Sequence, residues 1–86
     1  MAKLRGEPKL TNCTPVDVFR ALNKLGGFKI IEGSLHTKVV HLATGKSSTI
    51  PRHGKVNRYL LRDFIDNYLC RDLEISKKEI YKYLWC

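Results

Sequence analysis

The stretch FKIIEGSLHTKVVHLATGKSSTIP, residues 28–51, contains three short β-prone runs separated by turn residues. The runs cover residues 28–32, 36–42 and 47–50, and the last of them ends at Pro51. A Gly-Ser pair follows the first run, and a Thr-Gly-Lys turn follows the second. Short loops of this kind join neighbouring antiparallel strands. The stretch therefore predicts a three-stranded antiparallel sheet in the form of a meander.

Patterns typical of helices flank the three runs. Thr14 suits the cap of a first helix, and the proline after it suits the first helical position. Apolar residues then recur at helical spacing until a Gly-Gly pair, which readily ends a helix. A second apolar pattern, with the spacing i, i+3, i+4 and i+7, runs through residues 61–68. Ser76, with a glutamate three residues later, forms a capping-box pattern that predicts a third, short helix.

The predicted order of elements is α-β-β-β-α, with an extra helix at the C-terminal end. Two helices cannot cover both faces of a three-stranded sheet, so we expect the helices on one face and the other face open. This is an α+β fold, and its order resembles that of the double-stranded-RNA-binding fold. A chain of 86 residues is long enough for one domain. We assign that domain to residues 14–86, after a flexible basic tail of residues 1–13.

Positive charge dominates the composition. Sixteen Lys and Arg residues face eight Asp and Glu residues, which gives a net charge of +8 and a pI near 9.7. A basic domain of this size attracts polyanions, of which nucleic acid is the commonest. On charge alone, acidic proteins and membrane surfaces remain alternative partners.

The three cysteines, Cys13, Cys70 and Cys86, form no CxxC pair. An odd number without that spacing argues against a disulfide framework and against a zinc finger, so we interpret all three as reduced thiols. The first residues lack the apolar run of a signal peptide, and no stretch approaches the ~20 apolar residues that span a bilayer. We therefore expect a cytoplasmic protein with no membrane partner.

Two short motifs lie around the second and third β-prone runs. GSLHTK, residues 33–38, begins with the turn residues Gly33 and Ser34 and contains His36, and TIPRH follows at residues 49–53. Together they resemble the signature of the HicA toxin family, in the branch with one residue between the Gly-Ser pair and the histidine. The resemblance implies an mRNA interferase, which is the toxin of a type II toxin–antitoxin system. It also implies His36 as the catalytic residue and a HicB-like antitoxin as the protein partner.

The chemistry of RNA cleavage suits a single histidine on a small domain. RNA carries its own nucleophile, the 2′-hydroxyl, so the enzyme needs a base, an acid for the leaving 5′-oxygen and cations over the phosphate. Histidine, with an unperturbed pKa of about 6.5, acts as base or acid near neutral pH. The histidines and cysteines lack the spacing of zinc ligands, and the reaction requires no small-molecule cofactor. The sequence thus predicts a metal-independent endoribonuclease that cleaves mRNA.

Strand geometry predicts which side chain accompanies the catalytic histidine. Side chains alternate between the two faces of a strand, so His36 and Lys38 share one side and His41 points to the other. We expect Lys38 to neutralise the phosphate beside His36.

A second basic group lies between the third β-prone run and the second helix. Arg52, Lys55 and Arg58 are expected to bind RNA phosphates near the amino end of that helix, where the backbone also favours anions. His53, in the same loop, is assigned a supporting role in RNA binding.

Two other functions are compatible with the same residues. The first is a non-catalytic RNA-binding module of the double-stranded-RNA-binding type, which shares the element order and the charge. The second is an inactive HicA-like subunit whose main role is a protein interface, since an acidic antitoxin would equally explain the basic composition. Cleavage of RNA by the purified protein distinguishes the toxin from both alternatives.

Overall fold

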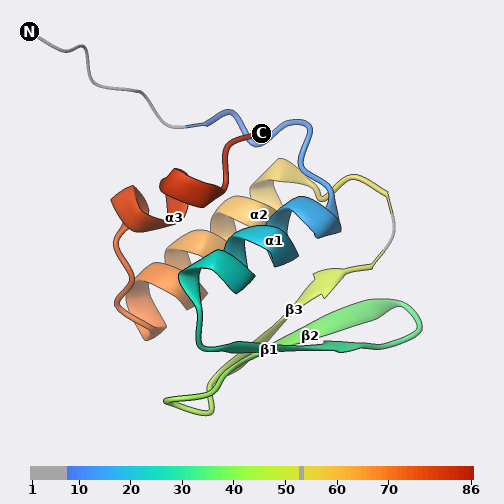
Figure 1. The fold of residues 1–86 in the computed structure, drawn as a ribbon. Coiled ribbons are helices and arrows are strands. Elements are labelled where there is room, and N and C mark those ends of the chain that lie inside the picture. Colours follow the sequence, from blue (N-terminus) through green and yellow to red (C-terminus); the bar gives the residue numbers. More distant parts are fainter. Residues whose placement is uncertain (1–7, 53) are drawn as a thin grey trace, which may run out of the picture.

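The computed structural model describes residues 8–52 and 54–86, and the elements in them follow the predicted order (Figure 1). They are α1 (Pro15–Leu25), β1 (Phe28–Glu32), β2 (His36–His41), β3 (Ser47–Pro51), α2 (Arg58–Asp63), η1 (Phe64–Asp72) and α3 (Lys77–Tyr83). Because η1 continues α2 without a break, the fold is a small α+β structure with a three-stranded sheet and three helices. In this part of the chain, no helix has the length and apolar character needed to cross a bilayer.

The sheet has the strand order β1-β2-β3, and both neighbouring pairs are antiparallel. β2 is therefore the central strand, which confirms the predicted meander. In the register, His36 lies opposite Pro51, and Lys38 lies between Ile31 on β1 and Thr49 on β3. This places the start of β2 beside the end of β3.

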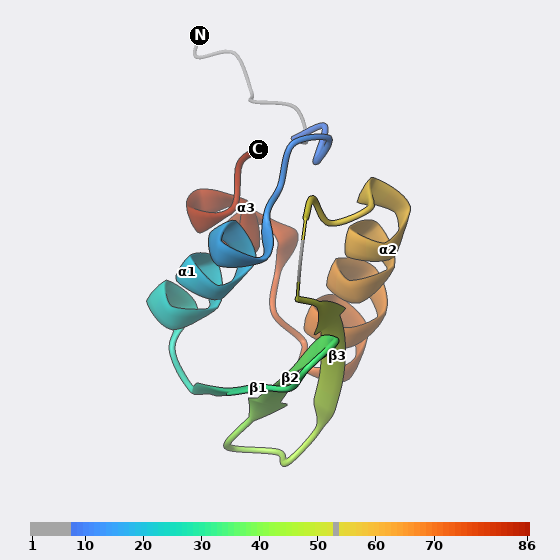
Figure 2. The same ribbon diagram turned by 90° about the vertical axis from the view of Figure 1, so that its right-hand side faces the viewer.

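The helices lie on one side of the sheet, as Figures 1 and 2 show, and α3 packs against α1. Alternate residues of β2 point toward this helical layer: Thr37 and Val39 are fully buried, whereas Lys38 between them is exposed. Among the described residues, no element covers the opposite face, so the sheet has the open face that the element order predicts. The core between the layers contains Val18, Leu22, Val39, Ile50, Leu61, Ile65, Leu69, Ile80 and Leu84.

The first and third helices begin at the predicted caps. The Thr14 hydroxyl accepts a hydrogen bond from the Asp17 amide at 3.3 Å, and the Asp17 carboxylate accepts one from the Thr14 amide at 2.9 Å. This reciprocal pair is a capping box. The Ser76 hydroxyl accepts from the Glu79 amide at 3.2 Å and caps α3. Gly26 ends α1 with a φ of +82°, a conformation that glycine adopts without steric cost.

The second helix extends beyond residues 61–68, where the apolar pattern predicted it, and it changes from α-helix to π-helix along its length. It has six residues of α-helix followed by nine residues of π-helix. On its inner side, the Tyr68 hydroxyl donates a hydrogen bond to the Lys46 carbonyl at 2.7 Å. Burial raises the pKa of Tyr68, so the hydroxyl keeps its proton for this bond. Tyr68 thereby ties the helix to the turn between β2 and β3.

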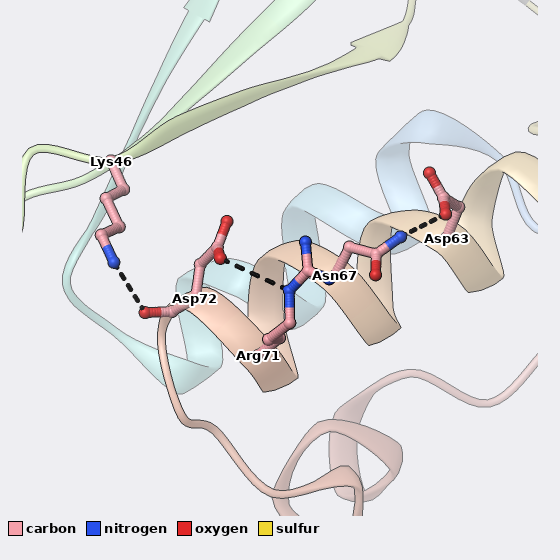
Figure 3. A network of polar contacts seen from close by, with 5 residues as sticks. All are labelled: Lys46, Asp63, Asn67, Arg71 and Asp72. Carbon is pink, nitrogen blue, oxygen red and sulfur yellow. Dashed lines mark hydrogen bonds and ion pairs between the residues drawn. The ribbon is translucent and has the colours of Figure 1, made fainter.

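The outer side of the same helix carries a set of exposed polar contacts (Figure 3). Lys46 Nζ donates to the Asp72 carbonyl at 3.3 Å, and Arg71 Nε lies 3.8 Å from the Asp72 carboxylate. The Asn67 amide donates to the Asp63 carboxylate one turn earlier. Exposed pairs of this kind contribute little to stability, typically about 0–1 kcal/mol. The apolar core and the Tyr68 bond therefore hold the helix on the sheet.

Residues 8–13 pack against the domain, although the sequence assigns them to a flexible tail. Leu10 and Cys13 are fully buried, and the Leu10 amide donates to the Cys86 carbonyl at 2.8 Å. The packed domain therefore includes residues 8–13 and does not begin at residue 14. The rest of the expected tail, residues 1–7, lies outside the described residues.

Cys13 and Cys86 form a disulfide, with their Cα atoms 5.3 Å apart, and Cys70 is a free thiol. The interpretation of three reduced thiols is therefore wrong for two of the three. The bridged residues are 73 positions apart, so only the folded chain brings them together. Cysteine spacing along the sequence carries no signal for such a pair.

Candidate functional site

His36 is the first residue of β2, and its side chain is exposed on the open face of the sheet. Lys38 is exposed on the same face, and buried Thr37 between them points into the core. This arrangement confirms the predicted alternation of side chains. An imidazole and an ammonium group therefore stand two positions apart on one accessible surface.

A tight turn precedes His36 and depends on Gly33. The Gly33 amide donates to the His36 carbonyl at 2.9 Å and closes the turn between β1 and β2. A Cβ atom on Gly33 would lie 2.7 Å from the same carbonyl oxygen, closer than real Cβ contacts allow. The predicted turn residue is thus required by close packing of the backbone. Leu35, in the same turn, is 72% exposed and points away from the core.

Arg52 fastens the end of β3 to this turn. Its amide donates to the Leu35 carbonyl at 3.2 Å, and its guanidinium donates to the Gly33 carbonyl. Arg52 also follows Pro51, the residue paired with His36 across the sheet. The guanidinium has five N–H donors, so the bond to Gly33 leaves others to face a phosphate. Arg52 therefore both braces the turn and brings positive charge to the end of the sheet where His36 lies.

Lys29, which is not among the site residues predicted from the sequence, adds a further positive charge to the open face. Lys29 on β1 lies opposite Val40 on β2, while Lys38 lies opposite Ile31. Diagonal neighbours of this kind in a sheet are separated by about 7–8 Å. Side chains also alternate between the two faces along residues 28–32. The reasoning that places Lys38 on the open face would therefore have placed Lys29 there as well.

Lys55 and Arg58 do not bond to the His36 turn. Lys55 Nζ donates to the Asn12 side-chain oxygen at 3.2 Å. The Arg58 guanidinium lies over the Tyr59 ring, 4.8 Å from its centre, and donates to the Tyr59 hydroxyl at 2.8 Å. Of the three predicted cations after β3, Arg52 is the one that the described structure bonds to this turn. His53, predicted to support RNA binding, lies outside the described residues.

The amino end of α2 is capped by the protein itself. The Asn57 side-chain oxygen accepts from the Tyr59 amide at 2.9 Å and from the Leu60 amide at 3.3 Å. From the sequence, the amides at this helix end are predicted to favour phosphate. Because Asn57 already satisfies them, the structure does not support a phosphate site formed by the amides of this helix end.

His41 lies on the other side of the sheet, as predicted. Its ring contacts the Phe28 ring with centroids 5.1 Å apart, and its Nδ1 lies 2.9 Å from the Thr44 hydroxyl. His41 is half-buried and is therefore not an acid–base partner for His36. Within residues 8–52 and 54–86, no group of three or more His, Cys, Asp or Glu side chains is arranged to hold a metal ion.

The site thus consists of an exposed imidazole at the start of the central strand, two lysines on the same face and an arginine bonded to the adjoining turn. Such a surface is complementary in charge to a polyanion and presents one imidazole, a side chain that can act as an acid or a base. The chain matches no protein-family model, no curated protein and no solved structure. Its function is therefore argued from these residues and from the motifs around them.

Proposed function

We propose that this protein is a HicA-like toxin, a metal-independent endoribonuclease that cleaves mRNA with His36 as the general acid/base. The observation that carries the proposal is the exposure of His36 on the open sheet face beside Lys38. The motifs at residues 33–38 and 49–53 agree with it, because the bonds of Gly33 and Arg52 give both motifs a structural role around His36.

In the proposed reaction, His36 takes the proton of the 2′-hydroxyl, and the 2′-oxygen attacks the neighbouring phosphorus. The bond from phosphorus to the 5′-oxygen breaks, and the leaving oxygen takes a proton from a solvent water. The hydroxide that this leaves is neutralised by the proton that the His36 imidazolium then releases, which returns His36 to its starting form. The products are a 2′,3′-cyclic phosphate and a 5′-hydroxyl end. Lys38 and Arg52 stabilise the negative charge that grows on the phosphate oxygens.

The proposal includes the fold family and the partners. The element order and the one-sided helical layer agree with a double-stranded-RNA-binding type of fold, in which we propose that the open face meets the RNA. With a net charge of +8, the chain suits both mRNA and an acidic antitoxin of the HicB type, which would inhibit the toxin by covering this face. We propose a cytoplasmic location, where mRNA is found. Cytosolic thiols are kept reduced, so the Cys13–Cys86 bridge would be open there and the protein correspondingly less stable.

The test compares wild type, His36→Ala and a matched control, Leu35→Ala, on a long RNA in the presence of EDTA. The control removes an exposed neighbour of His36 without changing any ionisable group. Wild type and Leu35→Ala should generate new 5′-hydroxyl ends and arrest growth when expressed. His36→Ala should bind RNA as before but cut at least about 100-fold more slowly, the usual contribution of one acid–base group. If His36→Ala cuts as fast as wild type, the proposed mechanism is wrong.

One observation favours a second candidate, the non-catalytic RNA-binding module. Among the described residues, the His36 ring has no hydrogen-bond partner, whereas catalytic histidines are usually oriented by a third group. A binding module needs only the charged face. Under this alternative, RNA binding weakens steeply with salt and no new RNA ends form during metal-free incubation.

A further inference from the structure

The two halves of the Cys13–Cys86 disulfide differ in exposure. Cys13 is fully buried, whereas Cys86 is half-buried and packs at the margin of the core. Figure 1 shows the chain after α3 lying beside the segment that leads into α1. A reagent in solution therefore reaches the bridge from the side of Cys86.

Cys13 is held in place independently of the disulfide. Its carbonyl accepts a hydrogen bond from the Val56 amide at 2.8 Å, and the Pro8 carbonyl of the same segment accepts one from the Arg62 guanidinium at 3.3 Å. Leu10, which lies between Pro8 and Cys13 in sequence, is fully buried in the core. These contacts do not require the sulfur–sulfur bond, so the Cys13 thiol stays buried when that bond opens.

Cys86 is held to the same segment by fewer contacts. Besides the disulfide, the Cys86 carbonyl accepts a hydrogen bond from the Leu10 amide at 2.8 Å. Leu84, two residues earlier, is buried, and its amide donates to the Ile80 carbonyl at 3.0 Å. Opening of the disulfide therefore lets Cys86 move, while buried Leu84 keeps its sulfur within reach of Cys13.

We propose that this disulfide is a redox-sensitive latch, which opens at Cys86 and leaves the rest of the fold in place, although less stable. Oxidising conditions keep the latch closed, and a dithiol reductant of the kind that keeps cytosolic thiols reduced opens it. The proposal does not depend on RNA cleavage, because none of the residues that form the latch belongs to the site around His36.

The latch opens by thiol–disulfide exchange. A thiolate of the reductant attacks the Cys86 sulfur, the bond to the Cys13 sulfur breaks, and its electron pair leaves on Cys13, which takes up a proton. The second thiol of the reductant, as its thiolate, attacks the mixed disulfide and releases the Cys86 thiolate, which also takes up a proton. The protein thus gains two electrons and two protons, and the reductant, which has lost both, becomes a disulfide.

The test reduces the folded protein with dithiothreitol in the absence of denaturant, removes the reductant by rapid desalting and adds iodoacetamide. Peptide mass spectrometry then follows the alkylation of each cysteine. We expect Cys86 to react at least about tenfold faster than Cys13, because a buried thiol reacts only when the structure around it opens. Cys70, which is unbridged, is the internal reference and should react at the same rate before and after reduction.

Three results of this experiment would overturn the proposal. Equal rates at Cys13 and Cys86 would mean that reduction loosens the whole end of the domain. A faster reaction at Cys13 would place the opening on the other side of the bridge. A bridge that resists dithiothreitol until denaturant is added would be a permanent cross-link and not a latch.

Reversibility is measured in Cys70→Ser, a variant in which the two latch cysteines are the only ones left. Equilibration with mixtures of reduced and oxidised glutathione should give one reversible transition between the open and the bridged protein. Wild type is the matched control and should show the transition at the same midpoint, because Cys70 takes no part in it. A reduced variant that fails to reclose, or that forms disulfide-linked dimers instead, would contradict the role of Leu84 in keeping the sulfur within reach and overturn the latch.

Discussion

The Arg52 guanidinium donates a hydrogen bond to the Gly33 carbonyl across 19 positions of the chain. This bond joins the end of the third strand to the turn that presents His36. A cation that the sequence marks as a phosphate ligand therefore also holds the candidate catalytic residue in position.

Replacing Arg52 should therefore lower the rate of cleavage more than it lowers RNA affinity. Arg52→Ala removes one bond to the turn and is expected to cost about 0.5–1.5 kcal/mol of folding free energy. The looser turn should reduce kcat about tenfold or more, because small displacements of a reacting group are costly. Single-turnover kinetics and urea unfolding measure the two effects. Arg52→Lys keeps the charge without the planar fork, so a full restoration of kcat by lysine would contradict the positioning role.

Gly33→Ala should damage both stability and cleavage. The added methyl group would lie 2.7 Å from the His36 carbonyl oxygen, so the turn must shift. We expect a loss of about 1–3 kcal/mol in unfolding free energy, in the range of overpacked sites. Thermal or urea unfolding measures it. Ser34→Ala, in the same exposed turn, is the control and should stay within about 0.5 kcal/mol of wild type. A Gly33→Ala protein as stable as the control would show that the turn accommodates the methyl group.

Lys29→Ala should weaken RNA binding without changing where RNA is cut. Lys29 shares the open face with Lys38, so each ammonium group should contact one phosphate. Loss of one contact lowers the slope of log K against log salt by about 0.7 for a single strand. Titrations at several salt concentrations give the slope. Lys24→Ala, on α1, removes the same charge from the helical layer and should leave the slope unchanged.

Reduction of the Cys13–Cys86 disulfide should destabilise the protein substantially. The bond joins residues 73 positions apart, and chain entropy for a loop of this length corresponds to about 4 kcal/mol. Cys86→Ser should therefore unfold at a lower urea concentration than wild type, whereas Cys70→Ser should be affected far less because Cys70 is unbridged. Thiol titration of unfolded, unreduced protein should find one thiol. Three thiols under oxidising conditions would mean that the bridge does not form.

Thr37→Val should stabilise the fold without touching the site. The Thr37 hydroxyl is fully buried and has no hydrogen-bond partner among the described residues. A buried unsatisfied hydroxyl costs about 1–3 kcal/mol, and valine has nearly the same shape. Unfolding by urea should show a gain of about 1 kcal/mol with unchanged cleavage. A loss of stability would indicate that the hydroxyl is satisfied in solution.

Local sequence patterns were sufficient for the order and type of the elements. The turn residues and β-prone runs between residues 28 and 51 predicted the meander, and Thr14 and Ser76 marked helix starts that the structure confirms. The alternation along β2 predicted which of its side chains face solvent. These features depend on interactions between residues a few positions apart, which is why the sequence reveals them.

Only the tertiary structure revealed the contacts between residues that are far apart in the chain. Leu10 and Cys13 belong to the core because the C-terminal residues fold back onto them, and no periodicity marks that contact. Arg52 and Lys55 are three positions apart in sequence, but Arg52 bonds to the turn before β2 whereas Lys55 bonds to Asn12. Contacts of this kind form only when the strands and helices have packed, because the geometry of the whole fold, and not local spacing, brings the partners within bonding distance.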